Sequence, residues 1–157
     1  MASGVAYWWQ KISAERPAEE SKAAATRKVK LYYYNKTKDI EASGFVSCSP
    51  DAVLPVEREI PRTDTPIEDT IRLLIEGELT EAEKAAGFTT EFPHPEFKLL
   101  DVDFKDGLLT LTFTEVRSFT VGGACRVTLL AAQIKKTARQ FPGVREVRLA
   151  PDSLFQP

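Results

Sequence analysis

The sequence has little of the residue types on which metal sites and acid–base catalysis usually depend. Its 157 residues include one histidine, two cysteines and one methionine. Zinc sites use several cysteine or histidine ligands at short, regular spacings, and no set of His, Cys, Asp and Glu in this chain has such a spacing. We therefore expect neither a metal nor any other cofactor.

Long apolar runs and long basic runs are also missing. No stretch approaches the roughly 18 apolar residues of a membrane-spanning helix, and no secretory signal is visible. The 21 basic residues are scattered and are balanced by 23 acidic ones, for a net charge of −2. Such a balance produces no field that attracts DNA or RNA, so we expect no nucleic-acid partner.

The composition fits one globular domain preceded by a short segment of another kind. Hydrophobic residues make up 43% and charged residues 28% of the chain, as in ordinary globular proteins. We assign residues 29–157 to the domain and residues 1–28 to a membrane-proximal or linker segment. Trp8 and Trp9 beside Lys11 are typical of a membrane–water boundary, which fits a removed N-terminal anchor. The alternative is a segment that docks on the domain or on a neighbour.

One long helix is the clearest local signal. Apolar residues recur on one stripe between Val127 and Phe141, with Gly122-Gly123 before the helix and Pro142-Gly143 after it. About 18 residues of helix span about 27 Å, enough to cross a small sheet. Gln133 and Gln140 fall largely away from the stripe.

Alternating apolar residues predict the strands, and capping signals predict two further helices. Strands are expected at 29–34, 53–61, 100–104, 109–114 and 147–149, with a hairpin turn at Asp106-Gly107. Capping boxes at Thr65–Glu68 and Thr80–Glu83 predict helices that end at Gly77 and Gly87. Residues 35–47 and 115–120 are expected to be loops, and Leu154 and Phe155 are expected to pack back onto the core. The fold class is α/β (α+β): a compact two-layer domain with a small mixed sheet of about four to five strands packed against two main helices.

The order of these elements resembles the GerMN domain, the sporulation and spore germination module. The resemblance covers about residues 29–150. It is carried by Lys30-Leu31-Tyr32-Tyr33-Tyr34, residues 54–61, Thr65-Pro66 through Leu74-Ile75-Glu76-Gly77, Asp106-Gly107, Gln133-Ile134, Thr137 and Gln140-Phe141-Pro142.

The resemblance implies a fold similar to ring-building modules and an extracytoplasmic bacterial domain on a lipoprotein or behind a membrane anchor. It implies no catalytic residues. The sporulation proteins that name the family carry two tandem copies, whereas this chain carries one, so a sporulation role does not follow from the resemblance.

The two cysteines have three interpretations. Cys48 precedes the second strand and Cys125 lies at the start of the long helix, so both are expected at one end of the sheet. In an oxidising compartment they would form a disulfide. Otherwise they are free structural thiols, or Cys125 is a nucleophile favoured by the helix N-terminus, with His94 as its base.

Other candidate residues are charged or aromatic. Gly122, Gly123 and Arg126 form a candidate anion site, since free N–H groups at a helix start favour negative charge; the alternative, which we favour, is that the glycines give a flexible entry into the helix. Arg58 falls in the apolar phase of its strand, so it lies at a sheet edge or meets a carboxylate, and it is a candidate ligand contact. Tyr32 and Tyr34 are candidates, with Trp8 and Trp9, for an exposed aromatic surface; the alternative, which we favour, is that the two tyrosines pack under a second helix. The carboxylate pairs Glu57/Glu59, Asp101/Asp103 and Glu81/Glu83 are explained by solvation or, in a wall hydrolase, by catalysis.

The sequence therefore favours a non-catalytic envelope domain that binds other envelope proteins or its own copies near the membrane. The alternative is a module that binds peptidoglycan or another anionic glycan through Arg58, Arg126 and the tyrosines. A wall-directed hydrolase using Cys125 or a carboxylate pair is the third hypothesis.

Overall fold

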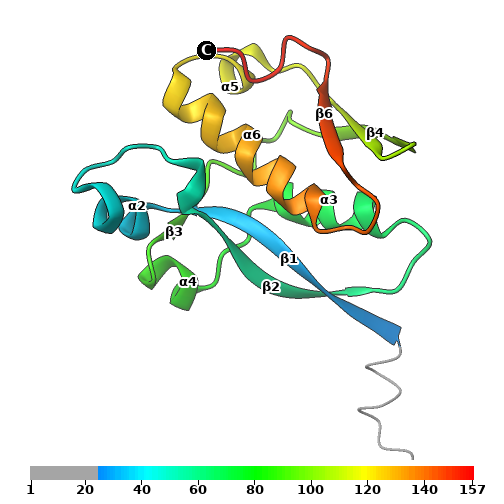
Figure 1. Cartoon of the computed structure of the whole chain (residues 1–157), viewed down its shortest axis with the longest axis horizontal. Helices are drawn as coiled ribbons and strands as arrows, with labels where there is room; N and C mark the ends of the chain where they lie inside the picture. Colours follow the sequence, from blue (N-terminus) through cyan, green and yellow to red (C-terminus); the bar gives the residue numbers. More distant parts are fainter. Residues whose placement is uncertain (1–24) are drawn as a thin grey trace, which may run out of the picture.

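The computed structural model describes residues 25–157 (Figure 1). Over this range the chain is a mixed α/β structure, which confirms the predicted class. The strands are β1 (Thr26–Asn35), β2 (Val53–Pro61), β3 (Phe88–Thr89), β4 (Leu99–Lys105), β5 (Leu108–Phe113) and β6 (Glu146–Ala150). The helices are α2 (Lys36–Ser43), the 3-10 helix η1 (Pro50–Ala52), α3 (Pro66–Glu76), α4 (Glu81–Ala85), α5 (Arg117–Thr120) and α6 (Ala124–Arg139).

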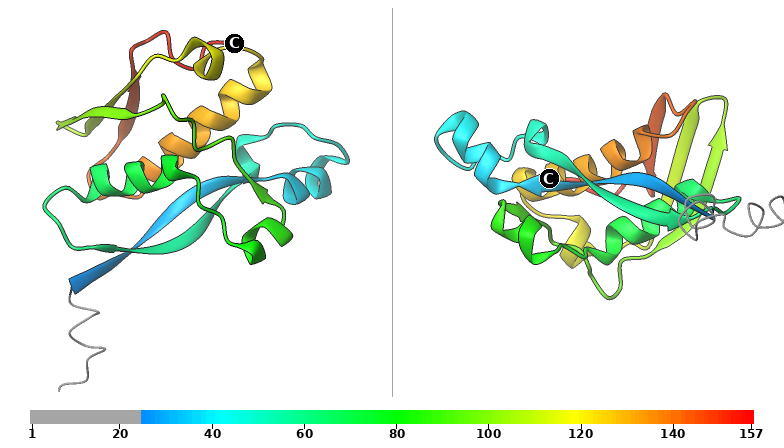
Figure 2. Two further views of the ribbon diagram at one scale, coloured as in Figure 1. Left: turned by 180° about the vertical axis from the view of Figure 1, so that it is seen from behind. Right: turned by 90° about the horizontal axis from the view of Figure 1, so that it is seen from below.

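The strands of this range are divided between two three-stranded sheets. In the first sheet, β1 pairs antiparallel with β2 and, over two residues, with β3. In the second, β5 pairs antiparallel with β4 and parallel with β6. Seen from below, β4 and β5 run across the direction of β1 and β2 (Figure 2). The single sheet of about four to five strands that we expected is therefore corrected to two smaller sheets.

Helix α6 separates the two sheets because it occupies the edge of β1 that a further strand would need. The side-chain oxygen of Gln140 accepts the N–H of Lys30 at 2.8 Å, and its amide group donates to the carbonyl of Lys30 at 2.6 Å. The hydroxyl of Thr137 accepts the N–H of Tyr32 at 3.0 Å. In Figure 1, α6 runs between β1 and the sheet of β4, β5 and β6. Two polar side chains thus satisfy backbone groups that a strand would otherwise pair.

The apolar stripe of α6 packs into the main core, as the periodicity predicted. Val127, Leu130, Ile134 and Ala138 are buried in one cluster with Leu109, Leu111 and Phe113 of β5, Val147 of β6, and Ile71 and Leu74 of α3. Full burial of one such aliphatic side chain is worth about 1.5–3 kcal/mol. Leu154 and Phe155 belong to the same cluster, which confirms that the C-terminal tail packs back onto the domain.

Several short elements were not predicted. Residues 36–43 form α2 and residues 117–120 form α5, both within segments expected to be loops, and η1 and β3 are further additions. Helix α2 has no apolar stripe, because Asp39 is its buried residue and Ile40 is exposed. It is defined by its ends: the Asn35 side chain accepts the N–H of Lys38, and Gly44 closes the helix at φ 82°. Strand β1 begins at Thr26, ahead of the predicted Val29.

One of the two predicted capping boxes is present. At α4, the Thr80 hydroxyl accepts the N–H of Glu83, whose carboxylate accepts the N–H of Thr80. At α3 the predicted box is wrong, because the Thr65 side chain makes no capping hydrogen bond. The carboxylate of Asp69 instead binds the hydroxyl of Thr63, which also accepts the N–H of Thr65. In residues 25–157 no helix has the length and apolar character needed to span a bilayer.

Replacing Thr137 by valine tests the contact between α6 and β1. The change keeps the shape of the side chain but leaves the N–H of Tyr32 without its acceptor, so we expect a loss of about 1–3 kcal/mol in the free energy of unfolding. Urea unfolding with an unchanged m value is the measurement. Thr128→Val, at an exposed position of the same helix, is the control and should change stability by less than about 0.5 kcal/mol. Equal losses in the two variants would contradict the assignment.

Candidate functional site

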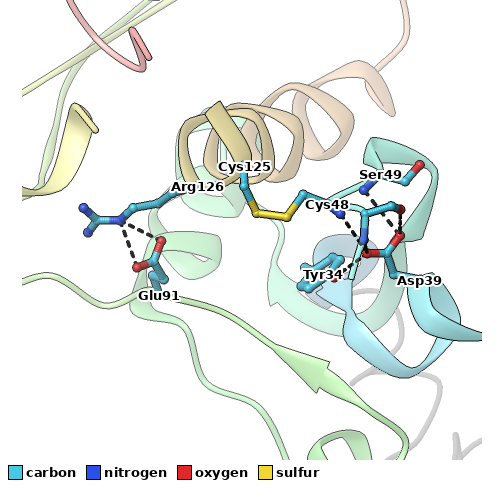
Figure 3. Close-up of a disulfide and its surroundings, with 8 residues drawn as sticks. Tyr34, Asp39, Cys48, Ser49, Glu91, Cys125 and Arg126 are labelled. Carbon is cyan, nitrogen blue, oxygen red and sulfur yellow. Dashed lines mark hydrogen bonds and ion pairs between the residues drawn. A yellow bond between two sulfur atoms is a disulfide. The ribbon is translucent and has the colours of Figure 1, made fainter. Parts of the chain in front are cut away.

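A disulfide joins the segment after α2 to the start of α6. The Cα atoms of Cys48 and Cys125 are 5.3 Å apart, and the two residues are separated by 77 positions in the sequence (Figure 3). Both cysteines of the chain are thereby used. A bond that closes so long a loop typically stabilises a fold by about 2–4 kcal/mol. Of the three interpretations of the cysteines, the structure has the disulfide.

The nucleophile hypothesis for Cys125 has no support in this arrangement. Its sulfur is bonded to Cys48 and is therefore not a thiolate. The His94 ring stacks on Phe119 with 4.7 Å between centroids, and its Nδ1 accepts the N–H of Glu96. The histidine is therefore part of the aromatic packing around Phe119.

A buried aspartate holds the chain around Cys48. Asp39 of α2 is 1% exposed, and its carboxylate accepts hydrogen bonds from the Tyr34 hydroxyl at 2.6 Å, the Ser47 N–H at 2.9 Å and the Cys48 N–H at 2.8 Å (Figure 3). The Ser47 hydroxyl and the Ser49 N–H also donate to it. Cys48 has a left-handed backbone with φ of 57°, and this set of donors fixes that unusual conformation.

The same hydrogen bonds explain why the pKa of the Asp39 carboxyl is low. The hydroxyls of Ser47 and Tyr34, and then the backbone N–H groups of Cys48 and Ser47, lower the pKa of Asp39 from 3.8 to about 2. Burial, followed by the hydrogen bond to Asp39, raises the pKa of Tyr34 to about 12. Asp39 is therefore an anion at neutral pH, and in this form it orders the loop.

Arg58, a candidate ligand contact, is already paired. Its guanidinium donates to both carboxylate oxygens of Glu83 at 2.7 Å and to the carbonyl of Glu78 at 2.9 Å. The hydrogen bonds that Arg58 donates to Glu83 raise the pKa of Arg58 and lower the pKa of Glu83. This is the carboxylate partner that the position of Arg58 in the strand suggested, and it ties β2 to α4.

The candidate anion site at the start of α6 is also partly neutralised. Arg126 Nε lies 2.9 Å from both carboxylate oxygens of Glu91, Nη1 donates to the Ser118 carbonyl at 3.0 Å, and the guanidinium lies over the Phe119 ring at 5.3 Å. Figure 3 shows Arg126 pointing to Glu91 and away from the disulfide. Gly122 and Gly123 have φ of 108° and 76°, so these glycines provide the turn into the helix.

The expected aromatic surface is corrected at Tyr34. This side chain is 7% exposed and is buried against Ala52 and Val53, because its hydroxyl reaches Asp39. Tyr32 is half-buried and packs against the same cluster of Tyr34, Ala52 and Val53, as do Leu129 and Ala132 of α6. Trp8 and Trp9 lie outside the described residues.

The carboxylate pairs do not converge on one place. Glu57 and Glu59 lie on β2, Asp101 and Asp103 lie on β4, and Glu83 is bound by Arg58 and by the α4 cap. In the part of the chain that the structure describes, no group of three His, Cys, Asp or Glu side chains is placed to bind a metal ion.

Sequence reasoning missed Asp39, the residue on which the disulfide loop depends. Its signal was weak but present: a lone aspartate one turn after the capping Asn35, followed by the donor-rich run Ser47-Cys48-Ser49. A carboxylate among serine hydroxyls and free N–H groups is a common way to satisfy a turn.

These features define a disulfide-bonded mixed α/β domain whose polar side chains mainly support its own loops. The sequence matches the family Germane, described as "Sporulation and spore germination", over residues 30–152. The chain therefore belongs to the Germane (GerMN) family, which is not known as a family of enzymes.

A solved structure shares the fold. The tandem GerMN domains of the sporulation protein GerM from Bacillus subtilis superpose with a TM-score of 0.57 and 21% sequence identity, over 84% of this chain. The match covers 42% of that structure, so this chain spans less than half of its length. No curated protein is significantly similar to the chain.

Replacing Asp39 by asparagine tests the anchor of the loop. Because its pKa in the folded state, about 2, lies below the ordinary 3.8, the carboxylate contributes stability above pH 3.8 and loses it as the pH falls toward 2. We expect Asp39→Asn to be less stable at neutral pH and to lose less stability than the wild type over that interval. Unfolding free energies measured across this range test the expectation. Asp64→Asn, at an exposed position, should keep the wild-type profile, and an unchanged profile in Asp39→Asn would contradict the role.

Proposed function

We propose that this domain is a non-catalytic interaction or assembly module of the bacterial cell envelope, working near the membrane. Membership of the Germane family supports a bacterial, envelope-associated role. Its partners in this proposal are other envelope proteins or further copies of the chain. Membrane attachment through an N-terminal anchor ahead of the described residues belongs to the same proposal.

The observation that carries this proposal is the apolar side chains left on the surface. Phe45 is 65% exposed, and Ile40 and Val46 are exposed beside it on α2 and the loop that follows. Leu100 is 58% and Phe104 44% exposed on β4. Single exposed apolar residues are ordinary, but neighbouring ones on a small domain favour a contact surface.

The structural partners of the candidate catalytic and binding groups support the same proposal. The thiols are in a disulfide, Arg58 and Arg126 are held by carboxylates, and Asp39 is surrounded by donors. Each of these groups has a structural partner and stabilises the local chain.

The disulfide supports the proposed location. Disulfides persist in oxidising compartments and are rare in a reducing cytosol. The loop around Cys48, which carries Phe45 and Val46, is fastened on one side by Asp39 and on the other by Cys125. A surface held rigid in this way loses little conformational entropy on binding.

A photo-crosslinking amino acid at Phe45 tests the proposal. With the full chain in its native envelope, we expect discrete adducts with an envelope protein when the probe replaces Phe45, because this side chain lies on the proposed contact surface. The matched control places the same probe at Asp64, an exposed position away from the apolar side chains, where discrete adducts should be absent. Identical patterns at the two positions would count against an interaction surface at α2.

Anionic glycan binding is the second candidate function, favoured by a shallow groove on the first sheet. The groove, of about 410 Å³, is lined by Lys28, Lys30, Tyr32, Glu57 and Gln140. Both lysines are exposed, and they precede Tyr32 at alternate positions of β1. An aromatic ring beside cations suits a sugar that carries carboxylates.

Reversing the lysine charges tests this candidate. Co-sedimentation of the protein with purified peptidoglycan should show binding that weakens with salt, because exposed charges are screened. Lys28→Glu combined with Lys30→Glu should abolish it, whereas Lys38→Glu on α2 should not. Binding by the double variant at the wild-type level would exclude this groove.

A further inference from the structure

Each sheet has edges, and those of the first sheet are protected. On one side of β1 the backbone groups of Lys30 and Tyr32 are occupied by α6. Pro55 of β2 lies opposite Tyr32 of β1. Tyr32 directs its N–H away from β2, toward Thr137 of α6. Because opposite residues of an antiparallel pair either bond each other or both face away, the backbone nitrogen of Pro55 faces the outer side of β2. A proline has no N–H to offer a new strand.

The second sheet, β4–β5–β6, has no proline in either edge strand, and the irregularity of β4 is confined to its start, between Leu99 and Asp101. The Glu146 N–H donates to the Gly107 carbonyl, so Glu146 faces β5 and the peptide groups of Val147 and Leu149 face outward, because direction alternates along a strand. By the same alternation, the peptide groups of Val102 and Phe104 on β4 point away from β5. The residues with outward-facing peptide groups on β4 are in register, across β5, with those on β6. One row of opposite residues is Phe104, Leu109 and Val147, and the next such row is Val102, Leu111 and Leu149.

In the alternate rows, whose peptide groups face β5, the charged side chains on β4 and on β6 have opposite signs. One row runs Asp103, Thr110, Arg148, and another runs Lys105, Leu108, Glu146. Each row therefore ends in opposite charges, an acid on β4 against a base on β6 or the reverse. All four charged residues are exposed. Within residues 25–157, Arg148 pairs with Asp152, at 3.1 Å, and both side chains of this pair are exposed.

Space for a further strand lies beside β6. A groove of about 470 Å³ borders β6 and is also lined by Leu108 of β5, by Ala131 and Lys135 of α6 and by Leu154 and Phe155 of the tail. Val147 and Leu149 lie in its wall. An apolar side chain on the core side of an added strand would enter this groove, and Phe104, 44% exposed on the core side of β4, is such a side chain.

We propose that β4 of one copy pairs antiparallel with β6 of the next, with Phe104 opposite Val147 and Val102 opposite Leu149. This register places Asp103 opposite Arg148 and Lys105 opposite Glu146, and it forms hydrogen bonds between the outward peptide groups of both edges. The inference rests on the proposed function and specifies its partner as a second copy of this chain. The contact is head-to-tail, so it leaves one β4 edge and one β6 edge free for further copies.

The pattern favours this pairing over one between two β4 strands. A symmetric β4–β4 pair with the outward residues bonded brings Asp103 opposite Asp103 or Asp101 in its longer registers, and like charges directly opposite each other are destabilising. The register with Phe104 opposite Phe104 brings Asp103 opposite Lys105, but it overlaps over residues 103–105 of each strand alone. The two complementary edges belong to the same chain, which is why the partner is a copy.

Charge reversal tests the pairing in solution with the full chain. We expect Asp103→Arg and Arg148→Asp each to weaken self-association by about tenfold or more, measured by sedimentation velocity over a concentration series. The double variant should recover it, because each reversed charge again meets its opposite. Asp64→Arg is the control and should associate like the wild type.

Mixing the two single variants gives a second test of the same contact. Each variant alone brings like charges together across the β4–β6 pair, two bases in Asp103→Arg and two acids in Arg148→Asp. Between the two variants every such contact joins a base to an acid, so the mixture should associate more strongly than either variant alone. Association of Asp103→Arg by itself at the wild-type strength would overturn the proposal.

Cysteine pairs test the register even where association is weak. Asp103→Cys in one copy and Arg148→Cys in another should form an intermolecular disulfide under mild oxidation, because opposite residues of a non-hydrogen-bonded pair approach closely. Asp101→Cys with Arg148→Cys, shifted by two residues, should form much less. Absence of the first crosslink, or equal yields of both, would overturn the inference. If the copies fail to associate while Phe45 still captures an envelope protein, the inference fails and the proposed function stands; if Phe45 captures nothing as well, both fail.

Discussion

The hydrogen bonds between α6 and the backbone of β1 determine how the rest of the chain is arranged. Gln140 offers Lys30 both an acceptor and a donor, and Thr137 offers Tyr32 an acceptor, as a neighbouring strand would. A helix that occupies a strand's edge prevents the second sheet from joining the first. The second sheet must then pack against the apolar side of α6, where Val127, Leu130 and Ile134 meet β5 and β6.

Both ends of α6 are fastened to distant parts of the chain. Cys125 in its first turn is bonded to Cys48, and Gln140 at its C-terminal end is bonded to β1. Lys136 adds contacts to the carbonyls of Pro50 and Val53. The loop that presents Phe45 is therefore held to α6 through Cys48 and to β1 through the pair of Tyr34 and Asp39. A rigid position for this loop follows from the disulfide and from the hydrogen bonds to the Asp39 carboxylate.

Local periodicity was enough to predict the parts whose partners lie close in the sequence. The stripe of α6, the alternation of β5 and the box at Thr80 depend on neighbouring residues. Gln140 and Thr137 resemble solvent-facing polar residues in the sequence because the backbone groups they satisfy lie 110 and 105 positions away. Asp39 was missed for a similar reason, since its donors at Ser47 and Cys48 follow eight and nine residues later, in a segment without apolar pattern. Tyr34 alternated like an exposed residue, and only the position of Asp39 turns its hydroxyl inward.

The contrast between the two sheets limits the kind of assembly that the second one permits. Neighbouring strands twist by about 20–25°, so in the proposed pairing a unit of three strands would turn the next copy by about 60–75° about the direction of the hydrogen bonds. Each β1 starts at Thr26, where the segment toward a proposed anchor leaves the domain, and this point turns with its copy. Within two or three copies the starting points face different directions. Copies attached to one membrane would therefore form short assemblies through β4 and β6, because longer ones would pull their anchors away from the bilayer.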